Sequence, residues 1–186
     1  MPKEKLLLHI CCATCSAFTL QKLQKDFDVT AYYYNPNIYP ADEYQQRFKE
    51  SKEFCEQHNI PFTEENPDQD RWFLLTQGHE NDEEKGDRCT ICYKIRLEKT
   101  AQYAKEHGYD IFGTDLSISP HKDAKRLNKI GRELAQVYGL KFLVADFKKN
   151  DGYKQAMELS KQQGFYRQDY CGCLFSMKRR KSNDQV

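Results

Sequence analysis

The sequence predicts an α/β protein with a parallel sheet. Short apolar runs that suit buried strands alternate with longer segments whose apolar residues recur at helical spacing. Strands separated by helices in this way pair in parallel through right-handed crossovers, which bring the carboxyl ends of several strands to one edge of the sheet. The 186 residues suffice for one such domain with a substantial core.

The first half of the chain begins with an apolar run over residues 5–10, which predicts the first strand. A helix is predicted over 17–25, with Thr14 or Ser16 as its N-cap. The other elements expected in this half are strands over 29–34 and 60–64 and helices over 42–59 and 72–77.

The second half begins with the charged segment 78–87, whose two glycines predict a mobile loop. Ser119 followed by Pro120 predicts the start of an amphipathic helix that ends at Gly139. The other expected elements are helices over 89–107 and 152–163, strands over 109–114 and 141–145, and an irregular segment over 164–173.

We expect a single domain over residues 1–186. Its parts are a core over about 5–150, a C-terminal helix with a Cys-Gly-Cys segment over about 151–176, and a basic tail over 177–186. The 29 Lys and Arg residues nearly balance the 28 Asp and Glu residues, so no overall basic field indicates nucleic acid. The basic run 178–181 fits either a local nucleic-acid contact or a solvated terminus.

The sequence also bears on the cellular compartment. No apolar run approaches the roughly 18 residues of a membrane span, and we recognise no secretory signal before the first strand. We therefore expect a cytoplasmic protein that does not act in a membrane. Its eight cysteines would stay reduced there, which favours metal or redox chemistry over disulfides.

Seven of the eight cysteines fall in three groups. They are Cys11, Cys12 and Cys15 after the first strand, the pair Cys89 and Cys92, and the pair Cys171 and Cys173. Thiols three residues apart share one face of a helix, a spacing that suits metal chelation or a thioredoxin-like redox pair. Ligands of open parallel sheets bind at the carboxyl ends of strands, so we expect the three groups to meet there. Cys55 lies on an apolar helix stripe and is expected to pack in the core.

The number of thiols favours an iron–sulfur cluster over zinc. One zinc ion takes four ligands, often from two Cys-x-x-Cys knuckles, whereas this chain has one such pair and seven grouped thiols. A [4Fe–4S] cluster takes four thiolates, or three with one iron open, and leaves the others for a second metal, a nucleophile or a proton donor. The expected metal ligands are Cys11, Cys12, Cys89, Cys92, Cys171 and Cys173, with Cys15 as the next candidate.

Polar residues at the ends of the predicted strands are further candidates. Tyr34 could stack on a base or donate a proton, or serve only as a strand aromatic. Asp115 and Asp146 could each bind metal, cap a helix or face solvent, and His9 more often satisfies strand hydrogen bonds than binds metal. The chain has neither G-x-x-x-x-G-K-[ST] nor G-x-G-x-x-G, which argues against ATP or NAD at the first turn.

Six motifs together resemble one family. They are His9-Ile10-Cys11-Cys12-Ala13-x-Cys15-Ser16, Tyr33-Tyr34-Asn35-Pro36-Asn37-Ile38, Arg88-Cys89-x-x-Cys92-Tyr93-x-x-Arg96-Leu97, Ser119-Pro120-x-Lys122, Asp146-Phe147 and Tyr166-Arg167-Gln168-x-Tyr170-Cys171-Gly172-Cys173. This set, which extends from about Leu6 to Ser176, resembles the QueH family of cobalamin-independent epoxyqueuosine reductases.

The resemblance implies a Rossmann-like, three-layer fold akin to the adenine-nucleotide α-hydrolases, with a cysteine-rich C-terminal segment. It implies that epoxyqueuosine at the wobble position of tRNA is deoxygenated to queuosine, the last step of queuosine synthesis. A [4Fe–4S] cluster and a second metal, iron, are implied without cobalamin, and an external donor must supply the electrons. The candidates for the chemistry itself are Cys11, Cys15, Tyr34 and Asp115.

The expected tRNA contacts are basic residues near the cysteines. They are Arg88, Lys94, Arg96, Lys122, Arg126, Arg167 and the run 178–181. Two rival functions fit part of the same pattern. A sulfur-inserting tRNA enzyme of this sheet architecture would need ATP, for which the phosphate loop is missing, and a zinc-bound RNA-binding module would need fewer thiols.

Overall fold

The computed structural model describes residues 2–183, with side chains through residue 180. A five-stranded sheet has the order β3-β2-β1-β4-β5, and its strand pairings are all parallel. Its strands are β1 (Lys5–Ile10), β2 (Asp28–Tyr33), β3 (Phe62–Glu64), β4 (Ile111–Thr114) and β5 (Lys141–Phe142). The chain winds outward from β1 to β3 and then resumes at β4 on the other side. The switch point of the sheet therefore lies between β1 and β4, where ligands of such folds bind.

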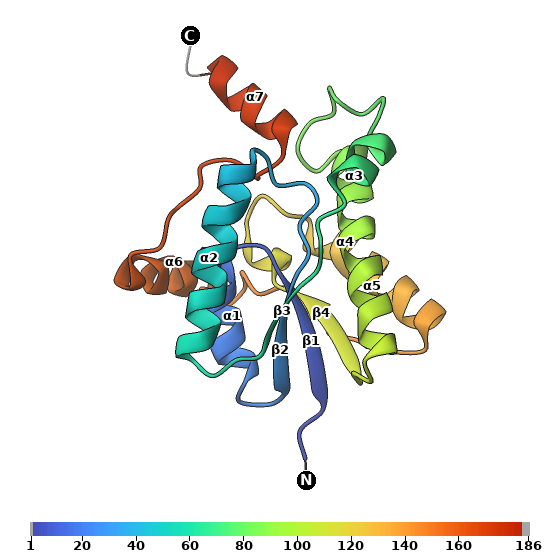
Figure 1. Ribbon diagram of the computed structural model, residues 1–186, viewed down its shortest axis with the longest axis vertical. Helices are drawn as coiled ribbons and strands as arrows, with labels where there is room; N and C mark the ends of the chain where they lie inside the picture. The colour runs from blue at the N-terminus through green and yellow to red at the C-terminus, as the bar shows by residue number, and fades with distance from the viewer. Residues whose placement is uncertain (1, 184–186) are drawn as a thin grey trace.

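Helices cover both faces of the sheet, so the predicted three-layer α/β architecture is confirmed (Figure 1). One layer contains α1 (Ala13–Leu23), α2 (Ala41–Gln57) and α6 (Gly152–Gln163), and the other contains α3 (Gln69–Leu75), α4 (Asp87–Glu106) and α5 (Ala124–Tyr138). Alternate residues of β1 divide between the two cores: Leu6 and Leu8 pack toward the first layer and Leu7 toward the second. A strand buried on both faces reads as a continuous apolar run, as β1 does.

The carboxyl ends of the strands all lie at one edge of the sheet. The 3-10 helix η1 (Leu116–Ile118) follows β4 there, and α7 (Leu174–Asn183) lies beyond the same edge, at the end of the molecule away from the N-terminus (Figure 1). No helix among residues 2–183 is long and apolar enough to cross a membrane.

The bounds of β1 and α6 match the prediction, but the start of α1 does not. The helix begins at Ala13, four residues before the predicted start at 17, and its N-cap is Cys12 rather than Thr14 or Ser16. Ser16 instead lies inside the first turn, where its hydroxyl donates to the Cys12 carbonyl at 2.9 Å. Two cysteines of the first group therefore lie at the N-terminus of a helix.

The predicted start of the amphipathic helix at Ser119-Pro120 is also wrong. Helix α5 begins at Ala124, because the Asp123 carboxylate caps it by accepting from the Arg126 N–H at 3.1 Å. Strand β5 is also shorter than predicted, because it ends at Phe142 and not at residue 145. Residues 178–180 of the predicted basic tail lie in α7, and residues 184–186 of that tail lie outside the described residues.

Candidate metal centre

The three groups of cysteines meet at the carboxyl ends of β1 and β4. One buried cavity is lined by Cys89, Cys92, Cys171 and Cys173. A pocket of about 240 Å³ adjoins it and is lined by Cys11, Cys15 and Cys171. Cys171 therefore belongs to the wall of both spaces. No disulfide joins any of the eight cysteines.

The four-cysteine cavity is built by the start of α4 and the segment before α7. Cys89 and Cys92 lie three residues apart in α4 and so share a face. Gly172 brings the other two thiols together with a φ of +107°, a conformation that glycine adopts at no steric cost. A Cβ at this position would also lie 3.0 Å from Arg47 Nη1, so a larger residue would crowd the Arg47 guanidinium.

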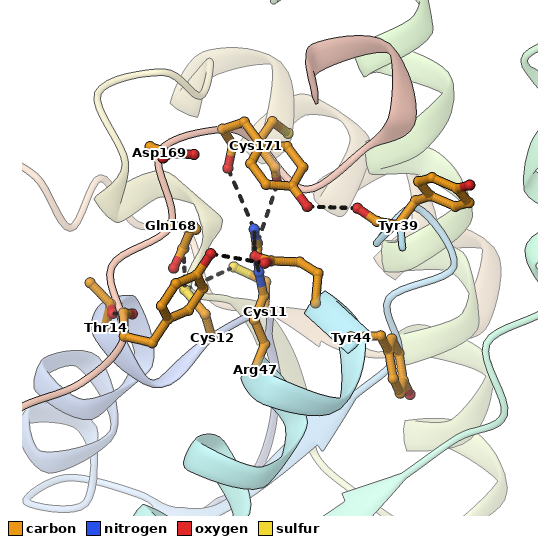
Figure 2. A network of polar contacts seen from close by, with 12 residues as sticks. Cys11, Cys12, Thr14, Tyr39, Tyr44, Arg47, Gln168, Asp169 and Cys171 are labelled. Carbon is orange, nitrogen blue, oxygen red and sulfur yellow. Dashed lines mark hydrogen bonds and ion pairs between the residues drawn. The ribbon is translucent and has the colours of Figure 1, made fainter. Parts of the chain in front are cut away.

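The thiols of the first group form a hydrogen-bonded set at the N-terminus of α1. Cys11 Sγ lies 3.8 Å from Cys12 Sγ, and Gln168 Nε2 donates to Cys12 Sγ at 2.9 Å (Figure 2). Hydrogen bonds from the Cys11 and Cys15 thiols hold the pKa of Cys12 well below its usual range, and donation to Cys12 raises the pKa of Cys11 to about 12. This set therefore favours one thiolate, on Cys12, next to protonated neighbours.

Buried cations surround the thiols. The Lys122 ammonium donates to Cys171 Sγ at 2.8 Å, and the hydrogen bond from Cys173 is the main reason that the pKa of Cys171 lies well below its usual range. Arg96 is 2% exposed, and burial lowers its pKa, but negative charge on Cys92 and Cys171 outweighs burial and raises the pKa of Arg96. These side chains supply positive charge that a metal–thiolate centre would balance.

His9 positions Arg96 rather than offering a metal ligand. Its Nδ1 lies 3.0 Å from Thr114 Oγ1, and its Nε2 lies 3.1 Å from the Tyr34 carbonyl oxygen and 3.2 Å from the donor Arg96 Nε. Burial, reinforced by the charge on Arg96, holds the pKa of His9 well below its usual range, so the ring is neutral. On the other side, Arg96 Nη2 donates to Asn35 Oδ1 at 2.6 Å, which fixes the guanidinium beneath the strand ends.

Asp115 is a buried carboxyl group without a hydrogen-bond partner. Its residue is 0% exposed, and neither carboxylate oxygen has a partner among the described residues. Burial raises the pKa of Asp115 well above its usual range, against the opposing effects of the charge on Arg96 and of the backbone N–H groups of Cys11 and Asp115. Such a group is costly to bury alone, which makes it a candidate for a ligand of a cation beside Cys11.

Other predicted residues lie apart from the thiols. The Tyr34 side chain lines a groove with Asp68 and Arg71, and neither cysteine cavity includes it. Asp146 pairs with Lys148 at 3.0 Å. Cys55 is fully buried in the core between the sheet and α2, so its predicted packing role is confirmed.

Several expected tRNA contacts are buried instead. Arg88 and Arg96 are each 2% exposed and bind groups inside the protein, as does Lys122. Lys94 and Arg167 remain exposed, and the side chain of Lys181 lies outside the described part of the chain.

Arg47 is a site residue that the sequence reading missed. Its guanidinium pairs with Glu43 at 2.6 Å and donates to the carbonyls of Tyr170 and Cys171, both at 3.4 Å (Figure 2). The sequence feature that could have identified Arg47 is its position on the apolar face of α2, between Tyr44 and Ser51. An arginine on a buried face needs partners inside the protein.

The donor set suits a cluster better than a single ion. No three His, Cys, Asp or Glu side chains within residues 2–183 converge as one metal ion requires. A [4Fe–4S] cluster binds each of its four thiolates to a different iron, so its ligands need not converge on one point. Four thiols around one cavity, together with the ammonium of Lys122 and the guanidinium of Arg96, supply the ligands and the balancing charge that a cluster needs, and the space between them, about 10 Å³, would have to widen to admit it.

Known proteins resemble the chain over almost all of its length. Residues 6–179 match the family model described as "Epoxyqueuosine reductase QueH". Proteins named epoxyqueuosine reductase QueH match it at 40% identity in Streptococcus pyogenes (95% of this chain, 71% of the relative), 41% in Acinetobacter baylyi (94% and 81%) and 34% in Thermotoga maritima (95% and 92%).

Solved structures share the fold at low sequence identity. The U34-tRNA thiolase NcsA from Methanococcus maripaludis, solved with its [4Fe–4S] cluster, has a TM-score of 0.61 at 16% identity, covering 100% of this chain and 67% of that one. A predicted tRNA methyltransferase subunit from Methanocaldococcus jannaschii has a TM-score of 0.53 at 14% identity, covering 84% and 76%.

Replacing Arg47 by leucine should loosen the segment that carries Cys171. The change leaves the Glu43 carboxylate and two carbonyls without their cation, so we expect the free energy of unfolding to fall by about 3 kcal/mol in urea titrations. Trypsin should also cut after Arg167 faster than in the wild type. The control is Lys49→Leu on the same helix, where the side chain is 72% exposed and the change should be within about 0.5 kcal/mol. Equal unfolding and cleavage in both variants would contradict this role of Arg47.

Proposed function

Because the chain belongs to the QueH family of epoxyqueuosine reductases, we propose that its four-cysteine cavity binds an iron–sulfur cluster and that the adjoining pocket binds the modified nucleoside of tRNA. The observation that carries this proposal is the position of Cys171, which lines both spaces and so joins the electron source to the substrate. Family membership favours this reductase over the sulfur-transfer enzyme and the zinc-bound RNA-binding module.

The reaction is a two-electron reduction of an epoxide. Both C–O bonds break, a C=C bond forms between the two carbons, and the oxygen leaves as water after taking up two protons. When bound, the cluster would supply electrons one at a time, and a second metal would act as a Lewis acid toward the leaving oxygen. An external donor must therefore deliver two single electrons per turnover, and the chemistry requires no cobalamin.

We propose that the seven grouped thiols divide between two centres. Cys89, Cys92, Cys171 and Cys173 line one cavity and would hold the cluster. The second metal, an iron ion, would be held by Cys11, Cys12 and Asp115, whose side chains do not converge on one point in this structure and would have to move together around the ion. The support for this second site is the buried, unpartnered carboxyl group of Asp115 next to the Cys11 thiol.

Cys15 is then a thiol without a metal to bind. It lines the substrate pocket near Cys11, where it can donate a proton to the leaving oxygen. Tyr34 is given no step, because its side chain lines a different groove. Gln168 also lines the pocket, and its donation to Cys12 Sγ would keep that sulfur oriented.

The tRNA would approach over the carboxyl edge of the sheet. Arg167 and His121 are exposed residues of the pocket lining, and Lys178 is exposed on α7, which lies beyond the same edge of the sheet (Figure 1). Because the pocket holds only about 240 Å³, the modified base must leave its stack to reach the thiols. We expect this to take place in the cytoplasm, where thiols stay reduced.

Removing a cluster ligand should abolish iron binding and activity together. Anaerobically purified Cys89→Ala and Cys92→Ala proteins should lose most of the roughly four irons and four sulfides of a [4Fe–4S] cluster and its visible absorption. Their turnover of epoxyqueuosine-tRNA with a chemical reductant should fall to background. Cys55→Ser is the matched control, since this thiol is buried in the core away from the site, and it should keep both iron and rate. Full iron content in the two alanine variants would exclude the pair as ligands.

Removing the Asp115 carboxylate should affect the second metal alone. Asp115→Asn should retain the visible spectrum of the cluster, lose about one iron per chain and slow turnover by about 100-fold or more, since Lewis-acid stabilisation is worth several kcal/mol. Asp146→Asn, at the partly exposed carboxylate paired with Lys148, should change neither quantity. An unchanged iron count in the Asp115 variant would remove Asp115 from the ligand set.

Binding of tRNA should weaken with salt. We expect the logarithm of the binding constant to fall linearly with the logarithm of salt concentration, and Arg167→Ala to reduce that slope by about one. Lys25→Ala, an exposed change after the far end of α1, should leave the slope unchanged. A slope near zero in the wild type would indicate a free nucleoside substrate instead of tRNA.

A further inference from the structure

Three side chains that line the four-cysteine cavity carry buried hydrogen-bond donors without partners. They are the indole Nε1 of Trp72, the Nε of Arg88 and the hydroxyl of Tyr93. Each residue is at most 2% exposed. They come from α3 and α4, so two separate elements contribute such residues to one cavity.

Leaving a buried donor unsatisfied is unfavourable, so three around one cavity call for acceptors. An indole N–H can only donate, and the same holds for the Nε–H of an arginine. Another nitrogen of the same guanidinium does have partners, because Arg88 Nη1 donates to the carbonyls of His79 at 2.8 Å and Glu80 at 3.0 Å. The Nε of Arg88 is therefore a donor without an acceptor, on a residue that lines the cavity.

Packing holds two of these side chains in place. The Arg88 guanidinium carbon lies 5.1 Å from the centre of the Phe175 ring, and the Trp72 ring lies 5.8 Å from the same ring. Phe175 belongs to α7, directly after the Cys171 and Cys173 segment. The donors are thus fixed before any cofactor binds, so their hydrogen bonds would require little reorganisation.

We propose that Trp72, Arg88 and Tyr93 donate hydrogen bonds to the sulfur atoms of the cluster in the four-cysteine cavity and thereby raise its reduction potential. The inference rests on the proposed function, which places the cluster there. Sulfide and thiolate sulfurs are the acceptors that such a cavity would contain, and hydrogen bonds to these sulfurs are one of the factors that set the potential of a cluster.

The direction of the effect follows from charge. Reduction by one electron takes the cluster from [4Fe–4S]²⁺ to [4Fe–4S]⁺, and the electron comes from an external reductant. The added negative charge strengthens each N–H or O–H bond to sulfur, because hydrogen bonds to charged acceptors are stronger. Donors therefore favour the reduced state and let a weaker reductant load the enzyme.

The test is an anaerobic redox titration with dithionite, followed by electron paramagnetic resonance, on Trp72→Phe and Tyr93→Phe. Each change removes one donor and keeps an aromatic ring. In each variant we expect the ratio of reduced to oxidised cluster at a fixed potential to fall about tenfold, which is about 59 mV for a one-electron couple. Iron and sulfide content should remain at the wild-type level.

Tyr32→Phe is the matched control. Tyr32 also has a buried hydroxyl without a partner, but it does not line the cavity, so its loss should leave the midpoint potential unchanged. Wild-type potentials in iron-replete Trp72→Phe and Tyr93→Phe proteins would overturn the inference and leave the proposed function intact. An equal shift in Tyr32→Phe would also overturn it, and absence of a cluster from the wild type would overturn the proposed function itself.

Discussion

The structure depends on positive charge buried next to sulfur. Arg96 has only neutral hydrogen-bond partners, Asn35 and His9, yet it is enclosed at the switch point of the sheet. Lys122 has a thiol as its contact. A buried cation costs several kcal/mol unless an anion lies close to it, and near these side chains the anions are cysteine thiolates. The fold and the thiolates are therefore energetically coupled, because the buried cations add to the hydrogen bonds from neighbouring thiols that lower the pKa of Cys12 and of Cys171.

The same coupling explains how a nucleotide-binding type of sheet accommodates different chemistry. In such folds the turn after the first strand normally carries glycines and binds phosphate at a helix N-terminus. Here Cys12 caps α1, so the helix N-terminus faces sulfur. The fold places a ligand site at the same turn after the first strand, but the residues at that turn determine its chemistry. A likeness in fold to other tRNA-modifying proteins therefore says little about reaction type without the site residues.

The sequence predicted the framework because its signals are local. The apolar run of β1 and the glycine-bounded helix α6 each need only their own residues to be recognised. The convergence of the cysteines also followed, since parallel strands must end at one edge. The start of α1 was missed because Cys12 occupies the N-cap and Cys15 the first turn. The N-cap position is more often occupied by serine or aspartate than by cysteine, so the sequence did not mark the start of the helix there. The roles of Arg47, Arg96 and Trp72 depend on contacts between distant segments, which spacing within one helix does not encode.

The candidate site is built from residues far apart in the sequence, and this determines when it can form during synthesis. Gln168 contacts Cys12 across 156 residues, and the Cys171 and Cys173 thiols come from the final segment before α7. A nascent chain that has emerged through β4 has its first strand, its first helix and the Cys89 pair, but half of the four-thiol cavity is still inside the ribosome. With the ligands proposed above, metal loading would follow release of nearly the whole polypeptide. The C-terminal segment would then act as a check on completeness, because a chain that lacks Cys171 and Cys173 would have only two of the four proposed cluster ligands.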